Sequence, residues 1–177
     1  MPEKTITICE NYGVDVWVPV EYWKVVRWYL SITWDPSKTT INKWALYIKW
    51  TEDWAGGGEL ELVVNDVKVY RNSASGFPPV GDEATVDVTN LIKNGDNRID
   101  TGLSGVGFLN RHYTITMKLT ATYEGEDTIN VTGRPPQTEI SASGWLNMLV
   151  STLIQMLPLV IMLFMLAFLF RIMFGRL

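Results

Sequence analysis

Tryptophan is the side chain of this sequence best suited to binding chemistry. Eight tryptophans are present, and seven of them lie between Trp17 and Trp54. An exposed tryptophan can stack on a sugar ring or fill a pocket at a protein interface, whereas a buried one packs a core. Trp54, beside the glycine-rich stretch 55–58, is the exposed candidate, and a protein interface is favoured over a sugar site. We expect most of those inside predicted strands to be core residues: Trp23, Trp28, Trp34, Trp44 and Trp50.

Ionisable side chains give weaker indications. His112 is the only histidine, and no cysteine or carboxylate follows it at metal-ligand spacing, so a structural role is expected. A calcium site stays open as an alternative, although no contiguous calcium-loop motif is present. It would draw on aspartates in or near predicted loops: Asp35, Asp53, Asp82, Asp87, Asp96 and Asp100.

No catalytic motif is recognisable. The sequence contains no nucleophile elbow, phosphate-binding loop or paired-acid motif. The net charge of −4 and the pI near 5.0 give no reason to expect nucleic-acid binding. Cys9 is the single cysteine, so no disulfide within the chain is expected. We therefore predict a protein that is not an enzyme and needs no cofactor.

Alternating apolar and polar residues predict a β-rich domain over residues 1–124. No stretch before residue 140 has helical periodicity, and turn residues separate the short runs, as is typical of a sandwich or jelly roll. Asn65 and Asp66 are expected at a hairpin tip. The fold class is therefore all-β, a jelly-roll-like β-sandwich, with strands expected at 5–9, 14–18, 24–34, 41–50, 59–64, 67–70, 84–88, 97–103 and 112–123.

Two segments carry a resemblance to a known family. Val63-Val-Asn-Asp66, followed by Asp87-Val-Thr-Asn-Leu-Ile-Lys-Asn-Gly-Asp-Asn-Arg-Ile99, resembles the non-catalytic sugar-binding jelly-roll domain of the β-galactosidase and β-glucuronidase type. The family has glycine where Asp66 stands. The resemblance covers about 40 residues and implies a fold, because the pattern is a structural corner rather than a ligand site. Leu91 and Ile92 can pack beneath such a corner, Gly95 permits a positive φ, and Asn97 is suited to bonding the local backbone.

The stretch 125–144 is rich in glycine, proline, serine, threonine and acidic residues, which predicts a linker. Asn130-Val-Thr132 fits the N-glycosylation sequon, so Asn130 is a glycosylation candidate if the domain is translocated.

The C-terminal fifth predicts a single transmembrane helix over 145–171, followed by a short basic tail, 172–177. No charged residue occurs between Ile140 and Phe170, and about 20 apolar residues suffice to cross a bilayer. Trp145 suits the interface, Arg171 and Arg176 close the far end, and Pro158 is expected to kink the helix.

A polar stripe marks one face of that predicted helix. Asn147, Ser151 and Gln155 recur every four residues and so share a face. The stripe could bind a partner helix, or it could lie in the headgroup zone in contact with water and lipid only. Both alternatives stay open.

The two indications of topology disagree. The arginines after the anchor place the tail in the cytoplasm, whereas the absence of a signal segment at Met1 favours a tail-anchored protein with a cytoplasmic domain. A virion membrane would be consistent with both the arginines after the anchor and the absence of a signal segment.

Our interpretation is a membrane-anchored structural or assembly protein of a virion or cell-surface particle. It is expected in a virion or cell membrane, as a homo-oligomer or with other envelope or capsid subunits. The alternatives are a membrane-tethered carbohydrate-binding or adhesion module and an accessory subunit of a membrane complex. Exposed aromatics beside a concave surface would favour carbohydrate, and a flat apolar patch over one sheet would favour assembly.

Overall fold

The computed structural model describes residues 1–17, 23–53, 58–74, 80–104 and 110–141, together with Met162 and Met165. The chain divides into two units, Met1–Ser141 and Ala142–Leu177. Met162 and Met165 are helical and exposed, and the rest of the predicted anchor lies outside the described residues. Among the residues described, no helix has the length and apolar character needed to cross a bilayer.

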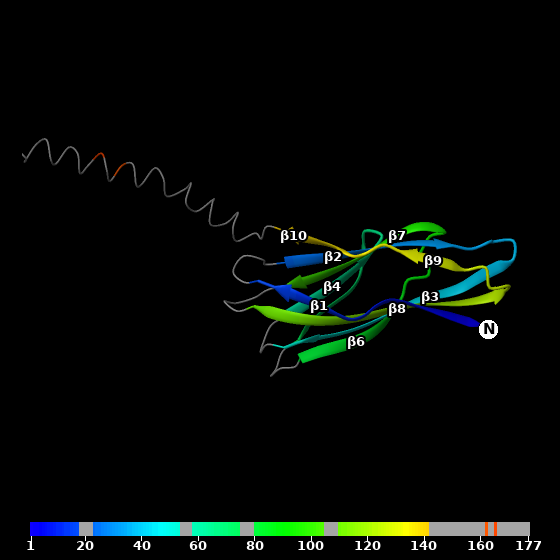
Figure 1. Cartoon of the computed structure of the whole chain (residues 1–177), viewed down its shortest axis with the longest axis horizontal. Helices are drawn as coiled ribbons and strands as arrows, with labels where there is room; N and C mark the ends of the chain where they lie inside the picture. The colour runs from blue at the N-terminus through cyan, green and yellow to red at the C-terminus, as the bar shows by residue number, and fades with distance from the viewer. Residues whose placement is uncertain are drawn as a thin grey trace, which may run out of the picture. The chain divides into compact units, whose positions relative to one another are not determined.

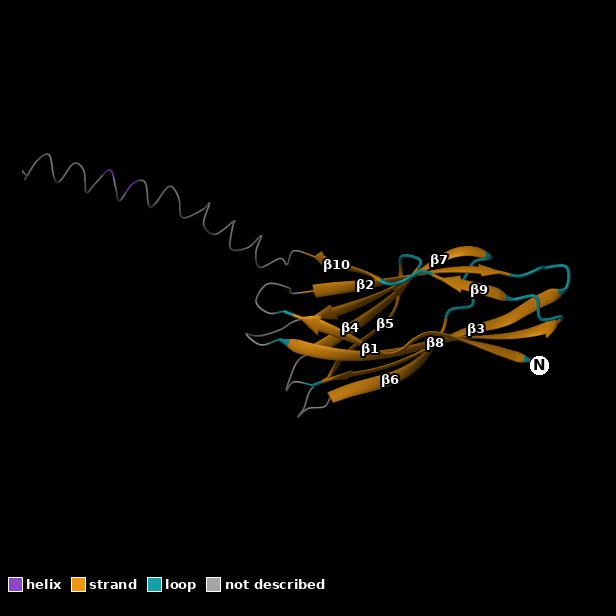
Figure 2. Cartoon of the chain, viewed as in Figure 1, coloured by secondary structure: helices purple, strands orange, loops and turns teal. Residues whose placement is uncertain are grey.

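The described residues include ten strands, which form two antiparallel sheets that face each other (Figures 1 and 2). The four-stranded sheet has the order β1 (Glu3–Val16), β8 (Arg111–Gly125), β3 (Thr39–Glu52), β6 (Val80–Asp87). The six-stranded sheet has the order β10 (Gln137–Ser141), β2 (Trp23–Thr33), β7 (Gly95–Ser104), β4 (Gly58–Val64), β5 (Val67–Ala74), and β9 (Asn130–Gly133) also pairs with β2.

The strand order is that of a jelly roll. From β1 to β8 the chain changes sheet at every connection except the β4–β5 hairpin, which gives the orders 1-8-3-6 and 2-7-4-5. This pattern closes eight strands into two facing sheets. The all-β sandwich expected for the first part of the chain is therefore confirmed.

Period-two alternation builds the core between the sheets. In β8 every second residue from Tyr113 to Tyr123 is buried, while the residues between them are half-buried. Trp28, Trp44 and Trp50 are buried in the same core, as predicted. Trp23 and Trp34 are only half-buried, and Trp17 is 56% exposed.

β1 is one strand where the sequence predicted two. Its pairing with β8 shifts register between Thr7 and Cys9 and again between Cys9 and Tyr12. Asn11 takes a positive φ of 48°, which asparagine tolerates better than most residues. The polar residues that seemed to separate two strands instead form irregularities within one.

The corner that carried the family resemblance is built as expected. Asn65 and Asp66 have φ values of 46° and 71°, which a type I′ hairpin turn requires, and Gly95 has a φ of 126°. Ile92 is buried, and Leu91 packs against the core. The side chain of Asn97 donates to the carbonyls of Lys93 and Gly95 and accepts from the Lys93 amide. These three bonds stabilise the backbone conformation of the corner.

Strands β9 and β10 lie in the stretch for which composition predicted a linker. Both pair with β2, β9 at Leu30–Thr33 and β10 at Trp23–Arg27. Between them, the amide of Arg134 donates to the carbonyl of Tyr29 at 3.0 Å. The described part of 125–144 thus completes the edge of the six-stranded sheet, and its prolines fall where the edge strand is interrupted.

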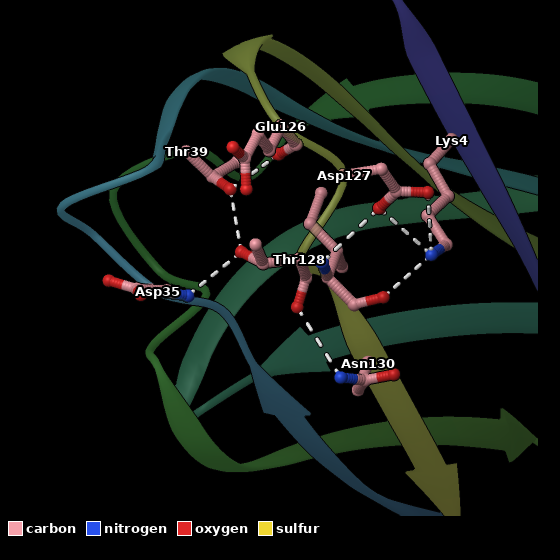
Figure 3. Close-up of polar contacts among 8 residues, drawn as sticks. Lys4, Asp35, Thr39, Glu126, Asp127, Thr128 and Asn130 are labelled. Atoms are coloured by element: carbon pink, nitrogen blue, oxygen red, sulfur yellow. Dashed lines mark hydrogen bonds and ion pairs between the residues drawn. The ribbon is translucent and has the colours of Figure 1, made fainter.

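Side chains fix the segment that leads from β8 to β9 (Figure 3). Lys4 binds the carboxylate of Asp127 at 3.0 Å and the carbonyl of Ile129 at 2.6 Å. The hydroxyl of Thr39 meets the hydroxyl of Thr128 and the carbonyl of Glu126, both at 2.6 Å. These contacts bring β9 onto β2 and explain why polar residues here do not form a linker.

Candidate functional site

The outward face of the six-stranded sheet holds the candidate site. On β2 the even-numbered residues point into the core, so the odd-numbered ones, from Trp23 to Ser31, point outward and are half-buried. On β7 the outward positions are Asp96, Arg98, Asp100 and Gly102, directly across from those of β2. We call this surface the outer face.

A hollow of about 290 Å³ lies on the outer face between β2, β7 and β4. Its size is near the lower end for small-ligand pockets, about 300 to 1,000 Å³. We call it the Trp23 hollow. It is lined by Trp23, Val25, Arg27, Glu61, Val63, Asp100 and Gly102.

Gly102 leaves room for this hollow in the middle of the sheet. A β-carbon at this position would stand 3.4 Å from Cε3 of Trp23 and 3.7 Å from Cβ of Glu61. Glycine therefore lets the indole lie close over the strand backbone. The aromatic ring forms one wall of the hollow, and the missing side chain forms its floor.

Trp23 is held in position from β5. The guanidinium of Arg71 lies 5.8 Å from the centroid of the indole ring, within the range of a cation–π contact. Arg71 also binds Glu59 on β4 at 2.6 Å. Because these contacts order the ring before any ligand arrives, binding would cost little side-chain entropy.

Asp100 and two arginines form an ionic group beside the hollow. Its Oδ2 lies 3.1 Å from Nε of Arg98 and 3.5 Å from Nε of Arg27, while Arg27 also pairs with Glu139 of β10. Burial raises the pKa of Asp100 above its ordinary value, although both arginines act to lower it. Its Oδ1 is buried without a hydrogen-bond partner among the described residues, so the carboxylate retains acceptor capacity.

A second hollow, of about 340 Å³, lies further along the same strands. Tyr29 and Ser31 of β2, Asp96 and Arg98 of β7, and Arg134 take part in its lining. We call it the Tyr29 hollow. Arg98 pairs with Asp66 and with Asp100, so it lies between the two hollows.

The structure describes few of the residues predicted as site residues. Trp54 lies outside the described residues, as do the anchor and stripe positions Trp145, Asn147, Ser151, Gln155, Pro158, Arg171 and Arg176. Asn130 is exposed in β9, and its side-chain amide donates to the Thr128 carbonyl at 3.4 Å. That position leaves the sequon accessible.

His112 is half-buried on β8, with Nδ1 2.7 Å from a carboxylate oxygen of Asp15. The aspartates named for calcium are spread over the fold. Asp35 binds Ser37, Asp87 binds Thr89, and Asp82 binds Tyr70 and Asn72. In the part of the chain that the structure describes, no three His, Cys, Asp or Glu side chains group as metal ligands would.

Sequence reasoning missed both hollows. Trp23 was expected in the core because it lies inside a strand, yet it is five residues from buried Trp28, an odd separation that places the two on opposite faces. The odd separation between Trp23 and Trp28 could therefore have shown from the sequence that Trp23 points away from the core. Nothing in the sequence shows that Gly102 lies across the sheet from Val25 and Glu61, because strand pairing decides it.

No family model matches this sequence, and no curated protein matches it either. Among solved structures, an α-L-rhamnosidase from Dictyoglumus thermophilum is 19% identical, with a TM-score of 0.41 over 78% of this chain and 16% of that one. A family 35 carbohydrate-binding module from an environmental isolate is 18% identical, with a TM-score of 0.39 over 71% and 76%. The module CBM36, in complex with calcium and xylotriose, is 12% identical, with a TM-score of 0.36 over 68% and 99%.

The likeness to these three structures is weak. All three identities are below 25% and all three TM-scores are below 0.5. Such values support no inference about what this chain binds.

Proposed function

We propose that this chain is a membrane-tethered carbohydrate-binding module. The observation that carries the proposal is the Trp23 hollow, where an ordered indole lies over Gly102 beside Asp100 and Arg27. A sugar ring has an apolar face that packs on an aromatic ring and hydroxyl groups that bond to charged side chains. The hollow offers both kinds of partner within one small volume.

The outward side of the four-stranded sheet is polar along its central strand β8. The outward side of β8 carries Thr114, Thr116, Lys118, Thr120 and Thr122, which are polar. A flat apolar patch there would have favoured an assembly role. The polar face supports the carbohydrate alternative over the structural one.

The tether is proposed from the sequence. The stretch 145–171 has the length and composition of a transmembrane helix. The proposed location is therefore a virion or cell membrane with a C-terminal anchor.

A second candidate is the structural or assembly role in a virion or cell-surface particle. The observation that favours it is Trp17, which is 56% exposed just after β1. Exposed tryptophan is enriched where proteins meet. If this role holds, the detergent-solubilised full-length chain should migrate as a defined oligomer or with partner proteins, and Trp17→Ala should weaken that association.

Glycan binding by the full-length chain in lipid nanodiscs tests the main proposal. A glycan array identifies ligands, and titration then compares the native chain with Trp23→Ala. We expect the variant to lose about tenfold or more in affinity, which corresponds to about 1.4 kcal/mol. Trp17→Ala is the matched control, since it removes another part-exposed indole that does not line the hollow. Binding that is absent from the array, or equal in Trp23→Ala and the native chain, would exclude a sugar site at this hollow.

A further inference from the structure

The two hollows lie on one continuous surface of the same two strands. Val25 and Arg27 border the Trp23 hollow, and Tyr29 and Ser31 border the Tyr29 hollow, at successive outward positions of β2. On β7 the same order runs from Gly102 and Asp100 to Arg98 and Asp96. At about 3.3 Å per residue, Trp23 and Ser31 are about 26 Å apart along β2. A single sugar ring cannot reach both hollows, whereas an extended chain of sugars can.

The ionic side chains give the two hollows opposite formal charges. The Trp23 hollow is lined by Arg27, Glu61 and Asp100, one positive and two negative charges, for a formal net charge of −1. The Tyr29 hollow is lined by Arg98, Arg134 and Asp96, two positive charges and one negative, for a formal net charge of +1. An elongated ligand that carries a negative group at one end would bind in one orientation.

Arg134 is the side chain placed to meet that negative group. Arg98 is already engaged by Asp66 and Asp100, whereas the guanidinium of Arg134 has no partner among the described residues. Its backbone amide is fixed to the Tyr29 carbonyl at 3.0 Å, and the proline that follows restricts its backbone further. A guanidinium on a stiff backbone can bind a carboxylate or sulfate through two parallel hydrogen bonds.

We propose that the two hollows are subsites for one linear, anionic oligosaccharide. A sugar ring packs on Trp23, the chain runs along β2 and β7 over the Arg27–Asp100–Arg98 group, and a carboxylate or sulfate near the other end binds Arg134. This proposal rests on the proposed function. It adds the length, the charge and the orientation of the ligand.

The test is calorimetric titration of the full-length chain in nanodiscs with oligosaccharides of one to six units. Matched series are neutral, carboxylated and sulfated. We expect affinity to rise with length until both hollows are occupied and then to level off, with an anionic series binding tighter than the neutral one. The anionic series that binds tighter identifies the group.

Arg134→Gln separates this proposal from the one it rests on. The variant should lose about tenfold in affinity for the anionic chains and leave the neutral chains unchanged. Lys49→Gln, which removes an exposed cation from β3 in the other sheet, should change neither. If sugars bind through Trp23 but length, charge and Arg134 have no effect, this inference fails while the proposed function stands. If no sugar binds, both fail.

Discussion

The indole of Trp23 lies against Gly102, with its Cε3 atom 3.4 Å from the point where a β-carbon would stand. That separation is an ordinary van der Waals contact, so alanine fits at this position without displacing the ring. The same methyl group would raise the floor of the Trp23 hollow. Stability and binding can therefore be separated by one substitution.

Gly102→Ala should keep or slightly raise the free energy of unfolding, by up to about 1 kcal/mol, because glycine within a strand costs more backbone entropy than alanine. It should weaken glycan binding severalfold. Gly133→Ala in β9 is the control for stability alone, since its β-carbon would meet only Leu30 Cδ2, at 3.5 Å. Denaturant titration and glycan titration measure the two effects, and unchanged binding in Gly102→Ala would contradict the assigned floor.

Asp100→Asn should change the free energy of unfolding at neutral pH by less than about 1 kcal/mol, despite two arginine neighbours. Burial raises the pKa of Asp100, so its charged form is disfavoured on folding. The native chain loses this unfavourable contribution as pH falls through the raised pKa, because the carboxylate is then protonated. The free energy of unfolding of Asp100→Asn, relative to that of the native chain, should therefore be highest above that pH. A loss of 2 kcal/mol or more at pH 7 in chemical denaturation, an order-of-magnitude limit for a broken ion pair, would show that the arginines dominate.

Asp82 should make stability fall at acid pH. Hydrogen bonds from Tyr70 and Asn72 lower its pKa below the ordinary 3.8. A lowered carboxyl pKa stabilises the fold above the unfolded-state value, and the contribution disappears as pH falls through the folded-state value. The melting temperature of Asp82→Asn should thus drop less between pH 6 and pH 3 than that of the native chain. Equal drops would mean that these bonds do not favour the charged form.

Glu52 and Arg111 form a buried ion pair, with Oε1 and Nη1 2.7 Å apart and side chains only 0% and 6% exposed. Arg111→Met should cost about 3 to 5 kcal/mol, since it leaves a buried carboxylate whose pKa burial already raises. Combining it with Glu52→Gln should cost less than the sum of the two single changes. The exposed pair Lys38–Glu126, at 3.3 Å, is the control and should couple by about 1 kcal/mol or less. Additive effects at Glu52 and Arg111 would contradict a coupled pair.

Local sequence chemistry predicted the jelly-roll corner well. Asn65, Asp66 and Gly95 each need a backbone conformation that few residue types accept, so their identities specify the turn. The strands from β2 to β8 were predicted near their observed positions for a similar reason, because one face of each is buried and the alternation is regular.

Properties that depend on pairing between distant segments were not predictable. β9 and β10 have the composition of a linker, and only contacts such as that between Lys4 and Asp127 bring them onto β2. The outer face likewise requires β2, β7 and β4 to lie side by side, which no single segment encodes. The predicted site residues in 145–171 and at Trp54 lie outside the described residues and stay predictions.

The interrupted edge of the six-stranded sheet disfavours strand addition between copies of this chain. A continuous edge strand offers a row of free amide and carbonyl groups on which another copy can add a strand and begin a fibre. Here Pro135 and Pro136 separate β9 from β10, and proline has no amide hydrogen to donate. Each half of this edge is therefore only four or five residues long, too short to template stacking of copies packed at high density.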